Sequence, residues 1–205
     1  MSPAATGTAG SQVLAAGGVE TPRFLLNTEL ANSSGMVGRN FLAHGAVQVW
    51  GRFAEQVRGY RGYPSAAITE DFVRPADADF AGGYLVQSLG VMPLTYATSL
   101  VRGGGLWGDE LMGELDAWRY SVGIGINGEC LPSDDNVLRL VDETDEWGVP
   151  RAEISFTPGA NEKAIDAHAV RTMTGILEAA GATSTRVLAR TAHTLGTCRM
   201  SDDPA

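Results

Sequence analysis

The stretch Tyr120–Gly128, Y-S-V-G-I-G-I-N-G, decides the fold. Valine and isoleucine alternate in it with serine, glycine and asparagine, which is the period-two pattern of a β-strand with one apolar face. The opposite face carries two glycines and consists largely of bare backbone, so another group can approach it closely. We therefore predict a strand that packs on one face and is open on the other.

Strand and helix signals continue on both sides of this stretch. Turn-forming residues separate it from apolar runs at 137–141 and 152–156, and we predict that the three strands form one antiparallel meander. Residues 47–53 alternate in the same way upstream. Apolar residues at helical spacing predict a helix with Asn161 as its N-cap and Gly181 as its stop. The expected class is α+β, an antiparallel sheet with packed helices.

The segment S-Q-V-L-A-A-G-G-V-E-T-P-R-F-L-L-N, residues 11–27, has a different character. It predicts a short buried strand that ends in a glycine pair, followed by a turn of helix begun near Pro22. This arrangement is typical of the last strand and turn of a larger sheet.

Composition restricts the classes of function. The 205 residues are 44% hydrophobic and 19% charged, which is a globular composition. Fifteen Lys and Arg against twenty-four Asp and Glu give a net charge of −9, which disfavours nucleic acid and anionic membranes as partners. No apolar run suits a membrane segment and no signal peptide is recognisable at the start, so we expect a cytoplasmic chain. Two cysteines and three histidines without ligand spacing predict neither a disulfide framework nor a metal site.

The last segment carries the strongest candidate for chemistry. A strand over 186–191 is expected to deliver His193 into a turn that contains glycine and threonine, and histidine suits proton transfer near neutral pH. The alternative is a structural histidine at a strand end, bonded to a backbone carbonyl. We expect His168 to be half-buried and structural, and Cys198 to serve packing.

Several separated segments resemble the glucose-methanol-choline (GMC) family of flavin oxidoreductases. They occur in the family's order from about Val13 to Pro204. The segments are L-A-A-G-G-V-E-T-P-R-F-L-L-N with L-A-N-S-S-G-M-V-G-R-N-F-L-A-H, then G-I-N-G-E-C-L-P-S-D-D-N-V-L-R-L-V-D, G-V-P-R-A-E-I-S-F, and H-T-L-G-T-C-R-M-S-D-D-P.

This resemblance implies an FAD enzyme that oxidises an alcohol, often on a sugar or polyol, by hydride transfer to the flavin N5. His193 matches the family's active-site base, which opens the H-x-x-G-T motif and accepts the hydroxyl proton. Asn40 matches a loop near the flavin. The residues that match the stretch lying against the FAD are Ala16, Gly17 and Gly18, where close approach excludes larger side chains. From the residues alone, turn-forming glycines and a capping asparagine are the alternative.

The resemblance also divides the chain into functional parts. Residues 1–45 would be a remnant of an incomplete α/β FAD-binding domain, 46–185 the substrate-binding domain, and 186–205 a return segment that carries the active-site histidine. The family's second active-site residue is expected beyond Ala205. His44 departs from the family pattern, because an alanine precedes it where relatives often carry an acidic residue, and we assign it no role.

We identify no G-x-G-x-x-G fingerprint for the FAD pyrophosphate in the sequence. The glycine spacing at Gly123 and Gly125 lies in a strand followed by another strand, whereas dinucleotide binding needs a turn between a strand and a helix. We therefore expect the isolated chain to bind no FAD and to be part of a larger enzyme. The alternative is a noncatalytic substrate-domain remnant or one piece of a split enzyme. The expected partner is a small alcohol or sugar, and the sequence leaves the electron acceptor open.

Overall fold

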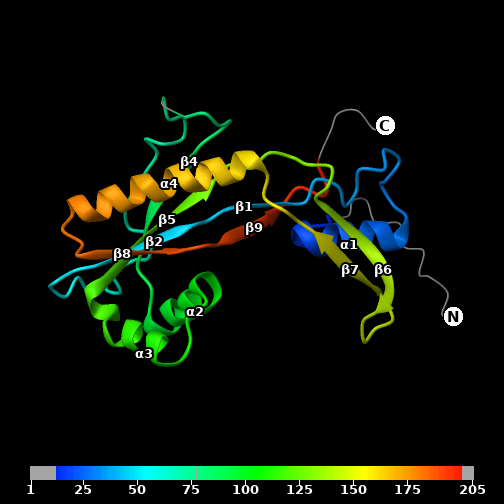
Figure 1. The fold of residues 1–205 in the computed structure, drawn as a ribbon. Coiled ribbons are helices and arrows are strands. Elements are labelled where there is room, and N and C mark those ends of the chain that lie inside the picture. Colours follow the sequence, from blue (N-terminus) through cyan, green and yellow to red (C-terminus); the bar gives the residue numbers. More distant parts are fainter. Residues whose placement is uncertain (1–12, 77, 200–205) are drawn as a thin grey trace. The chain divides into compact units, whose positions relative to one another are not determined.

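The computed structural model describes residues 13–76 and 78–199. Residues 1–12 and 200–205, which belong to the predicted FAD-domain and return segments, lie outside the described residues. Within the described ranges, the chain forms four α-helices, one 3₁₀ helix and nine strands, and every strand pair with a defined register is antiparallel (Figure 1). The expected α+β class is confirmed.

The chain divides by compactness into two units. The larger unit consists of Leu42–Ser133 and Thr157–His193. The smaller unit consists of the residues up to Phe41, Asp134–Phe156, and the residues from Thr194 onward. The functional division predicted from the sequence stays a prediction.

A five-stranded antiparallel sheet forms the centre of the larger unit. Its strands, in spatial order, are β3 (Ile68–Thr69), β4 (Tyr84–Leu89), β5 (Ser121–Gly128), β2 (Gln48–Arg52) and β8 (Ser184–Leu188). The strands predicted upstream and at the central stretch are confirmed as β2 and β5.

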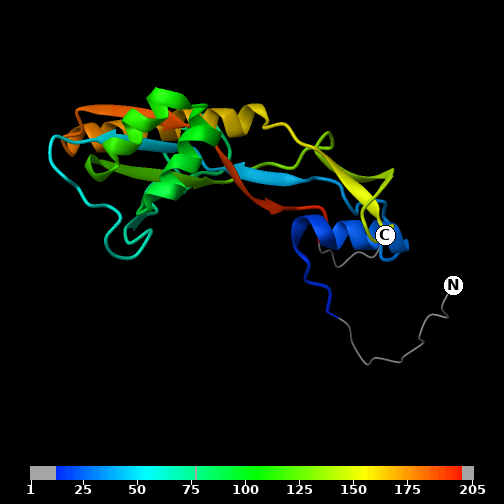
Figure 2. The same ribbon diagram turned by 90° about the horizontal axis from the view of Figure 1, so that it is seen from below.

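Helices cover both faces of this sheet. Helix α4 (Ala160–Ala179) packs on one face, and α2 (Pro93–Gly104) lies with α3 (Gly108–Asp116) on the other, as both views show (Figures 1 and 2). The 3₁₀ helix η1 (Trp118–Tyr120) leads from α3 into β5. The sheet therefore separates two apolar layers.

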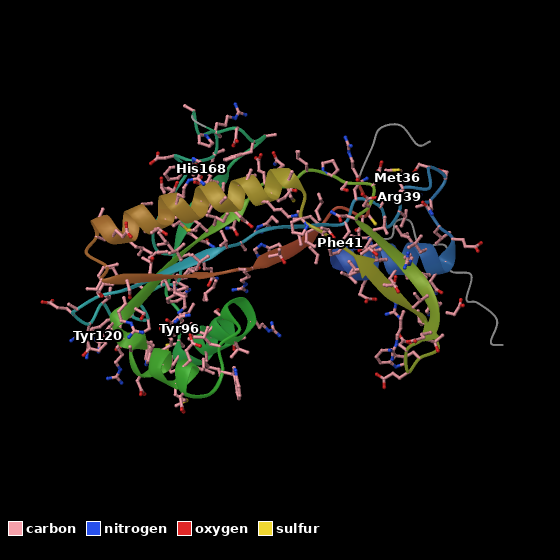
Figure 3. The ribbon with its side chains drawn as sticks, in the orientation of Figure 1. Met36, Arg39, Phe41, Tyr96, Tyr120 and His168 are labelled. Atoms are coloured by element: carbon pink, nitrogen blue, oxygen red, sulfur yellow. The ribbon has the colours of Figure 1, made fainter. Side chains whose placement is uncertain are left out.

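The alternation of side chains in β2 explains the two layers. Val49 is fully buried in the cluster that includes residues of α4, whereas the next residue, Trp50, belongs to the cluster with α2 and α3. Figure 3 shows His168 of α4 and Tyr96 of α2 on opposite sides of the sheet. A strand that is apolar on both faces is expected between two layers of helices.

The predicted N-cap of α4 is wrong by two residues. The helix begins at Ala160, and the Glu162 side chain accepts a hydrogen bond from the Gly159 N–H (2.8 Å). Asn161 instead holds the preceding loop, because its side chain accepts from the Ala81 N–H (2.8 Å) and donates to the Ala81 carbonyl (3.1 Å). The predicted stop is confirmed, since Gly181 follows the helix with φ +94°.

The predicted three-stranded meander is also wrong. Strand β6 (Val137–Thr144) pairs with β7 (Pro150–Ser155) in a separate two-stranded sheet. Both edges of β5 are already occupied, by β2 on one side and β4 on the other, so β6 cannot join it. The positions of the strands are encoded by neighbouring residues, whereas the pairing of the strands depends on which sheet edges remain free.

The glycine face of β5 is partly covered. A Cβ added at Gly123 would lie 2.5 Å from the indole of Trp50, so the group that approaches this backbone is a core tryptophan. The interpretation that the sequence contains no G-x-G-x-x-G spacing is wrong by letter, because residues 123–128 have it; these residues, however, lie within a strand paired on both edges. Their main-chain N–H groups are engaged in the sheet and cannot form a pyrophosphate cradle.

The smaller unit is built on helix α1 (Gly17–Thr28) and the β6–β7 hairpin. Arg23 of α1 binds the hairpin, with Nε donating to the Pro150 carbonyl (2.7 Å) and Nη2 donating to Asp145 (2.5 Å). The hydrogen bond from Arg23 lowers the pKa of Asp145 below its usual value. The turn predicted between these strands is confirmed, since Asp145 also accepts from the Trp147 N–H (2.9 Å).

The predicted N-terminal strand does not appear in the described residues. Residues 13–16 are exposed and irregular, and α1 starts at Gly17 rather than near the proline. Pro22 lies inside the helix and cannot donate to the Gly18 carbonyl one turn earlier. The Thr197 hydroxyl lies 3.0 Å from that carbonyl oxygen and 2.6 Å from the Gly196 carbonyl oxygen, so its one proton is shared between the acceptor that the proline leaves free and a second carbonyl.

Candidate active site

His193 lies in a strand rather than in the turn predicted for it. It belongs to β9 (Thr191–Leu195), which pairs with β1 (Leu42–Gly45). Its φ is +49°, in the left-handed region that non-glycine residues seldom adopt. Its side chain is exposed, so a ligand has access to the ring. Backbone strain at an exposed histidine is an arrangement often found at functional sites.

The structure places a second histidine against His193. His44 Nε2 lies 2.6 Å from His193 Nδ1, and the ring centroids are 4.8 Å apart. His44 is buried, with 8% of its surface exposed, and its Nδ1 lies 2.9 Å from the Gly45 carbonyl oxygen. The sequence analysis assigned His44 no role. The local signal was a histidine in an otherwise apolar strand, whereas its partner is 149 positions away in the chain.

His193 lines a small cavity of about 200 Å³ whose lining combines polar side chains with the apolar residues Ala46, Leu89, Ile126 and Ala192. The sequence analysis did not select the polar side chains that share this cavity with it. These are Gln48, Gln87, Asn127 and Arg190. Their amide and guanidinium groups supply both donors and acceptors, which is the complement that a polyhydroxylated ligand needs.

Strand register explains why the cavity forms here. Gln48 of β2 and Gln87 of β4 both pair with Gly125, so the glycine lies between two glutamines on the central strand. A Cβ at Gly125 would lie 3.3 Å from the Gln48 side chain and 3.3 Å from that of Leu89, so any larger residue would narrow the cavity. The glycine face predicted to permit close approach therefore lines the cavity at Gly125, with the side chains of Gln48 and Leu89 close beside it.

The orientation of Gln48 is fixed by the neighbouring core. Its Oε1 accepts a hydrogen bond from the Trp50 indole N–H (3.1 Å). The amide NH₂ of Gln48 therefore stays available as a donor on the cavity side of the strand pair. This contact links a cavity-lining side chain to the apolar cluster that Trp50 forms with residues of α2.

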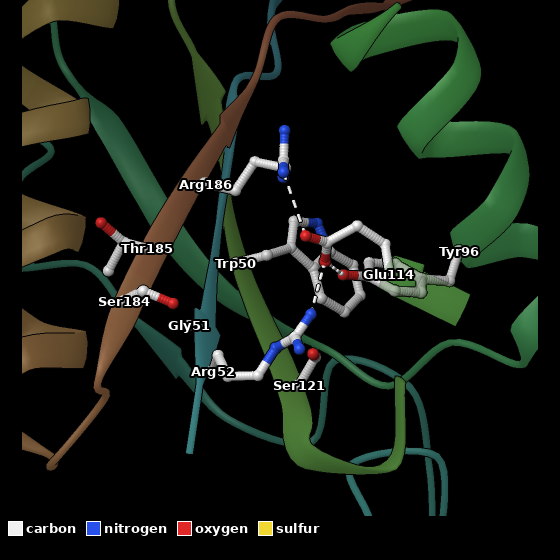
Figure 4. Close-up of a pocket in the computed structure, with 9 residues that line it drawn as sticks. All are labelled: Trp50, Gly51, Arg52, Tyr96, Glu114, Ser121, Ser184, Thr185 and Arg186. Carbon is white, nitrogen blue, oxygen red and sulfur yellow. Dashed lines mark hydrogen bonds and ion pairs between the residues drawn. The ribbon is translucent and has the colours of Figure 1, made fainter. Parts of the chain in front are cut away.

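A second cavity on the same unit has a structural character (Figure 4). Arg52 of β2 and Arg186 of β8 both donate to Glu114 of α3, at 2.7 and 3.0 Å. Burial raises the pKa of the adjacent Tyr96, so its hydroxyl stays protonated. The carboxylate has partners on two strands, and the cluster attaches α3 to the sheet. We assign it no chemistry.

The four residues predicted to contact FAD lie in the smaller unit. A Cβ added at Gly17 (φ +79°) would meet no atom within 4 Å, so the main chain at the start of α1 is open to close approach. Gly18 differs, because a Cβ there would lie 3.0 Å from the Thr194 carbonyl oxygen, and protein packing alone requires the glycine. Ala16 donates its N–H to Thr21 (3.0 Å), and Asn40 has φ +54°.

The remaining candidates have protein partners or raised pKa values. His168 is half-buried, as predicted, and its Nδ1 lies 2.7 Å from the Tyr84 hydroxyl. Burial raises the pKa of both thiols, Cys130 and Cys198, which is the opposite of what a nucleophilic cysteine needs.

The part of the chain that the structure describes has neither a metal-ligand cluster nor a membrane-spanning helix. No group of three or more His, Cys, Asp or Glu residues there is arranged to hold a metal ion. None of the described helices combines the length and the apolar character needed to cross a membrane.

Comparisons with known proteins point to oxidoreductases. No protein-family model matches the chain. It is 28% identical to the fructose dehydrogenase large subunit of Gluconobacter japonicus and 27% identical to the 2-methyl-1,2-propanediol dehydrogenase of Mycolicibacterium austroafricanum, in each case over 94% of the chain. The chain spans 38% of the length of each of these relatives. Both names describe dehydrogenases, which supports a dehydrogenase-like oxidoreductase.

Proposed function

We propose that the chain is the substrate-side part of an FAD-dependent dehydrogenase that oxidises a CH–OH group of a small sugar or polyol. The observation that carries this proposal is an exposed histidine, His193, at a cavity with polar side chains, with one ring nitrogen bonded to another histidine. Both of these similar proteins are named for substrates with more than one hydroxyl group, which agrees with the glutamine, asparagine and arginine side chains of the lining.

In this proposal His193 is the general base. A carbinol carbon releases hydride readily only when its hydroxyl proton leaves as well, so a base beside the hydroxyl accelerates the step. Nδ1 of His193 is engaged by His44, and Nε2 is the nitrogen left for the substrate proton. The amides of Gln48 and Gln87 would bind neighbouring hydroxyls and orient the carbinol.

FAD would act as the hydride acceptor when bound. The open main chain at Gly17 fits one wall of a flavin site, because no side chain there excludes a ring or a phosphate. The main pyrophosphate-binding turn would come from polypeptide other than the chain described here, since the G-x-G-x-x-G spacing in this sequence is part of β5. The GMC resemblance and the 38% coverage of the relatives both agree with a larger enzyme.

The test measures the rate of flavin reduction in the flavin-loaded enzyme that contains this chain. Stopped-flow absorbance monitors the reduction after mixing with fructose or with a vicinal diol. Replacing the base, His193→Ala, should slow reduction by about 10²- to 10⁴-fold and change substrate binding little. His168→Gln is the matched control. His168 lies on α4 and contacts Tyr84 and Phe80, so its replacement should leave the rate unchanged.

Two outcomes would contradict the proposal. An unchanged reduction rate in His193→Ala would remove His193 from the mechanism. Failure of every sugar and polyol to reduce the flavin would favour a noncatalytic role for the chain.

A further inference from the structure

We propose that His44 is a positioning residue that holds His193 in one tautomer, with the proton on Nδ1 and the lone pair on Nε2. The tautomer follows from the contacts of the histidine pair alone. Its catalytic consequence, a base whose lone pair is presented to substrate, rests on the proposed function.

The first step starts from the Gly45 carbonyl. A carbonyl oxygen only accepts hydrogen bonds, so His44 Nδ1, at 2.9 Å from it, must carry a proton. In a neutral imidazole the other nitrogen then has the lone pair. His44 Nε2 is therefore an acceptor, and the 2.6 Å contact requires His193 Nδ1 to donate.

The second step concerns the charge of His44. If His44 were a cation, both of its nitrogens would donate, and His193 Nδ1 would have to accept. The proton of His193 would then lie on its own Nε2, which would leave no lone pair there for a substrate proton. His44 is buried, with 8% of its surface exposed, and the donor and acceptor roles above are those of its neutral ring. The carboxyl group of Asp166, from α4, lies against Gly45, where a Cβ would be 2.6 Å from its Oδ1. Burial raises the pKa of Asp166 to about 6, so this carboxyl group is a charged neighbour of Gly45 at the pH 8 of the test below.

Pairing of the two strands holds the histidine pair in place. His44 and His193 lie on β1 and β9, which pair with one another, and the Ala46 N–H donates to the Arg190 carbonyl (3.1 Å) just beyond them. The left-handed backbone of His193 further restricts where its ring can point. Because both rings are attached to one two-stranded ladder, the Nδ1–Nε2 contact is preorganised before a ligand binds.

Once His193 Nε2 accepts a proton, its Nδ1–H still donates to His44. That bond then has a charged donor, and charge-assisted hydrogen bonds are about twice as strong as neutral ones. His44 therefore stabilises the protonated state of the base without itself contacting the substrate.

The tautomer is measured in the 205-residue chain itself, without flavin, by long-range ¹H–¹⁵N NMR of the histidine rings at pH 8. The wild-type spectrum should show His193 protonated at Nδ1 and unprotonated at Nε2, with a coupling across the hydrogen bond to His44 Nε2. In His44→Phe, the His193 signal should shift toward the Nε2–H tautomer. His44→Gln keeps an acceptor oxygen and should retain the wild-type tautomer.

A His193 protonated at Nε2 in the wild-type chain would overturn the proposal, and so would a cationic His44. The wild-type spectrum decides this point even if His44→Phe does not fold. His168, the third histidine, provides an internal reference whose signals should be the same in all variants.

The catalytic consequence is tested separately in the flavin-loaded enzyme. His44→Phe should lower kcat at least about tenfold with little change in KM, and His44→Gln should restore most of the rate. If His193→Ala slows flavin reduction but His44→Phe does not, the positioning role is wrong and the proposed function stands. If neither variant slows reduction, the proposed function fails, whereas the NMR result on the tautomer is unaffected.

Discussion

Asp166 is the residue whose ionisation should affect stability most clearly. Its Oδ1 is buried without a hydrogen-bond partner, and burial together with the nearby Glu162 raises its pKa to about 6 from an ordinary value of 3.8. The folded chain therefore binds more protons than the unfolded chain between about pH 4 and pH 6. The free energy of unfolding is therefore higher at low pH, where Asp166 is neutral, and falls as the pH rises through that window.

We predict that Asp166→Asn stabilises the chain at pH 8 by on the order of 1 kcal/mol, allowing for the partial exposure of the carboxyl, and has little effect at pH 4. Urea unfolding at several pH values measures this difference. Glu178→Gln, at an exposed position on the same helix, is the control and should give the same curve as wild type. A variant with the wild-type pH slope would show that Asp166 ionises normally.

The residue scale also shows what local sequence leaves out. The histidine of the H-T-L-G-T segment was selected because its neighbours resemble a known motif. His44 was not, because its significance depends on the Nε2–Nδ1 contact with a residue 149 positions away. Likewise, nothing in the sequence around Gln48 or Gln87 distinguishes these residues from other polar residues of a strand. They become neighbours of one cavity because the strand register pairs both of them with Gly125.

At the scale of the element, α4 depends on one buried side chain. Glu162 accepts from the Gly159 N–H through Oε2 (2.8 Å) and from the Leu131 N–H through Oε1 (2.8 Å). Glu162 thus caps α4 and also holds the segment that follows β5 against the start of this helix.

We expect Glu162→Ala to reduce the free energy of unfolding by about 1–3 kcal/mol, because two partly buried hydrogen bonds lose their acceptor. Glu162→Gln should cost less, since the amide oxygen still accepts one bond. Urea denaturation measures both, and Lys163→Ala, at the exposed next residue, is the control. Equal stability of Glu162→Ala and the control would show that water replaces the carboxylate without penalty.

Elements were predictable to the extent that their signals are local. The alternation in β2 and β5, the turn at Asp145 and the end of α4 at Gly181 depend on residues within a few positions of one another. The strand predicted before Gly17 failed, since no neighbouring strand pairs with residues 13–16 among those described.

At the scale of the whole molecule, the proposal predicts how the isolated chain treats FAD. The G-x-G-x-x-G spacing of residues 123–128 is engaged in sheet pairing, so the chain lacks a helix-capped pyrophosphate site there. We expect the purified 205-residue chain to show no visible flavin absorbance and no heat of binding on titration with FAD. The flavin-loaded larger enzyme is the positive control, and a yellow isolated chain would contradict the prediction.

Local sequence was sufficient to predict the class of fold, the strands β2, β5, β6 and β7, helix α4, and the candidate His193. These depend on side-chain periodicity, turn chemistry and a short motif, which neighbouring residues encode. The tertiary structure decided which strands pair, that the Thr197 hydroxyl contacts the Gly18 carbonyl, and that His44 bonds His193. Such contacts join distant segments, and they are set by which edges and faces remain free once the sheet and its two helical layers have packed.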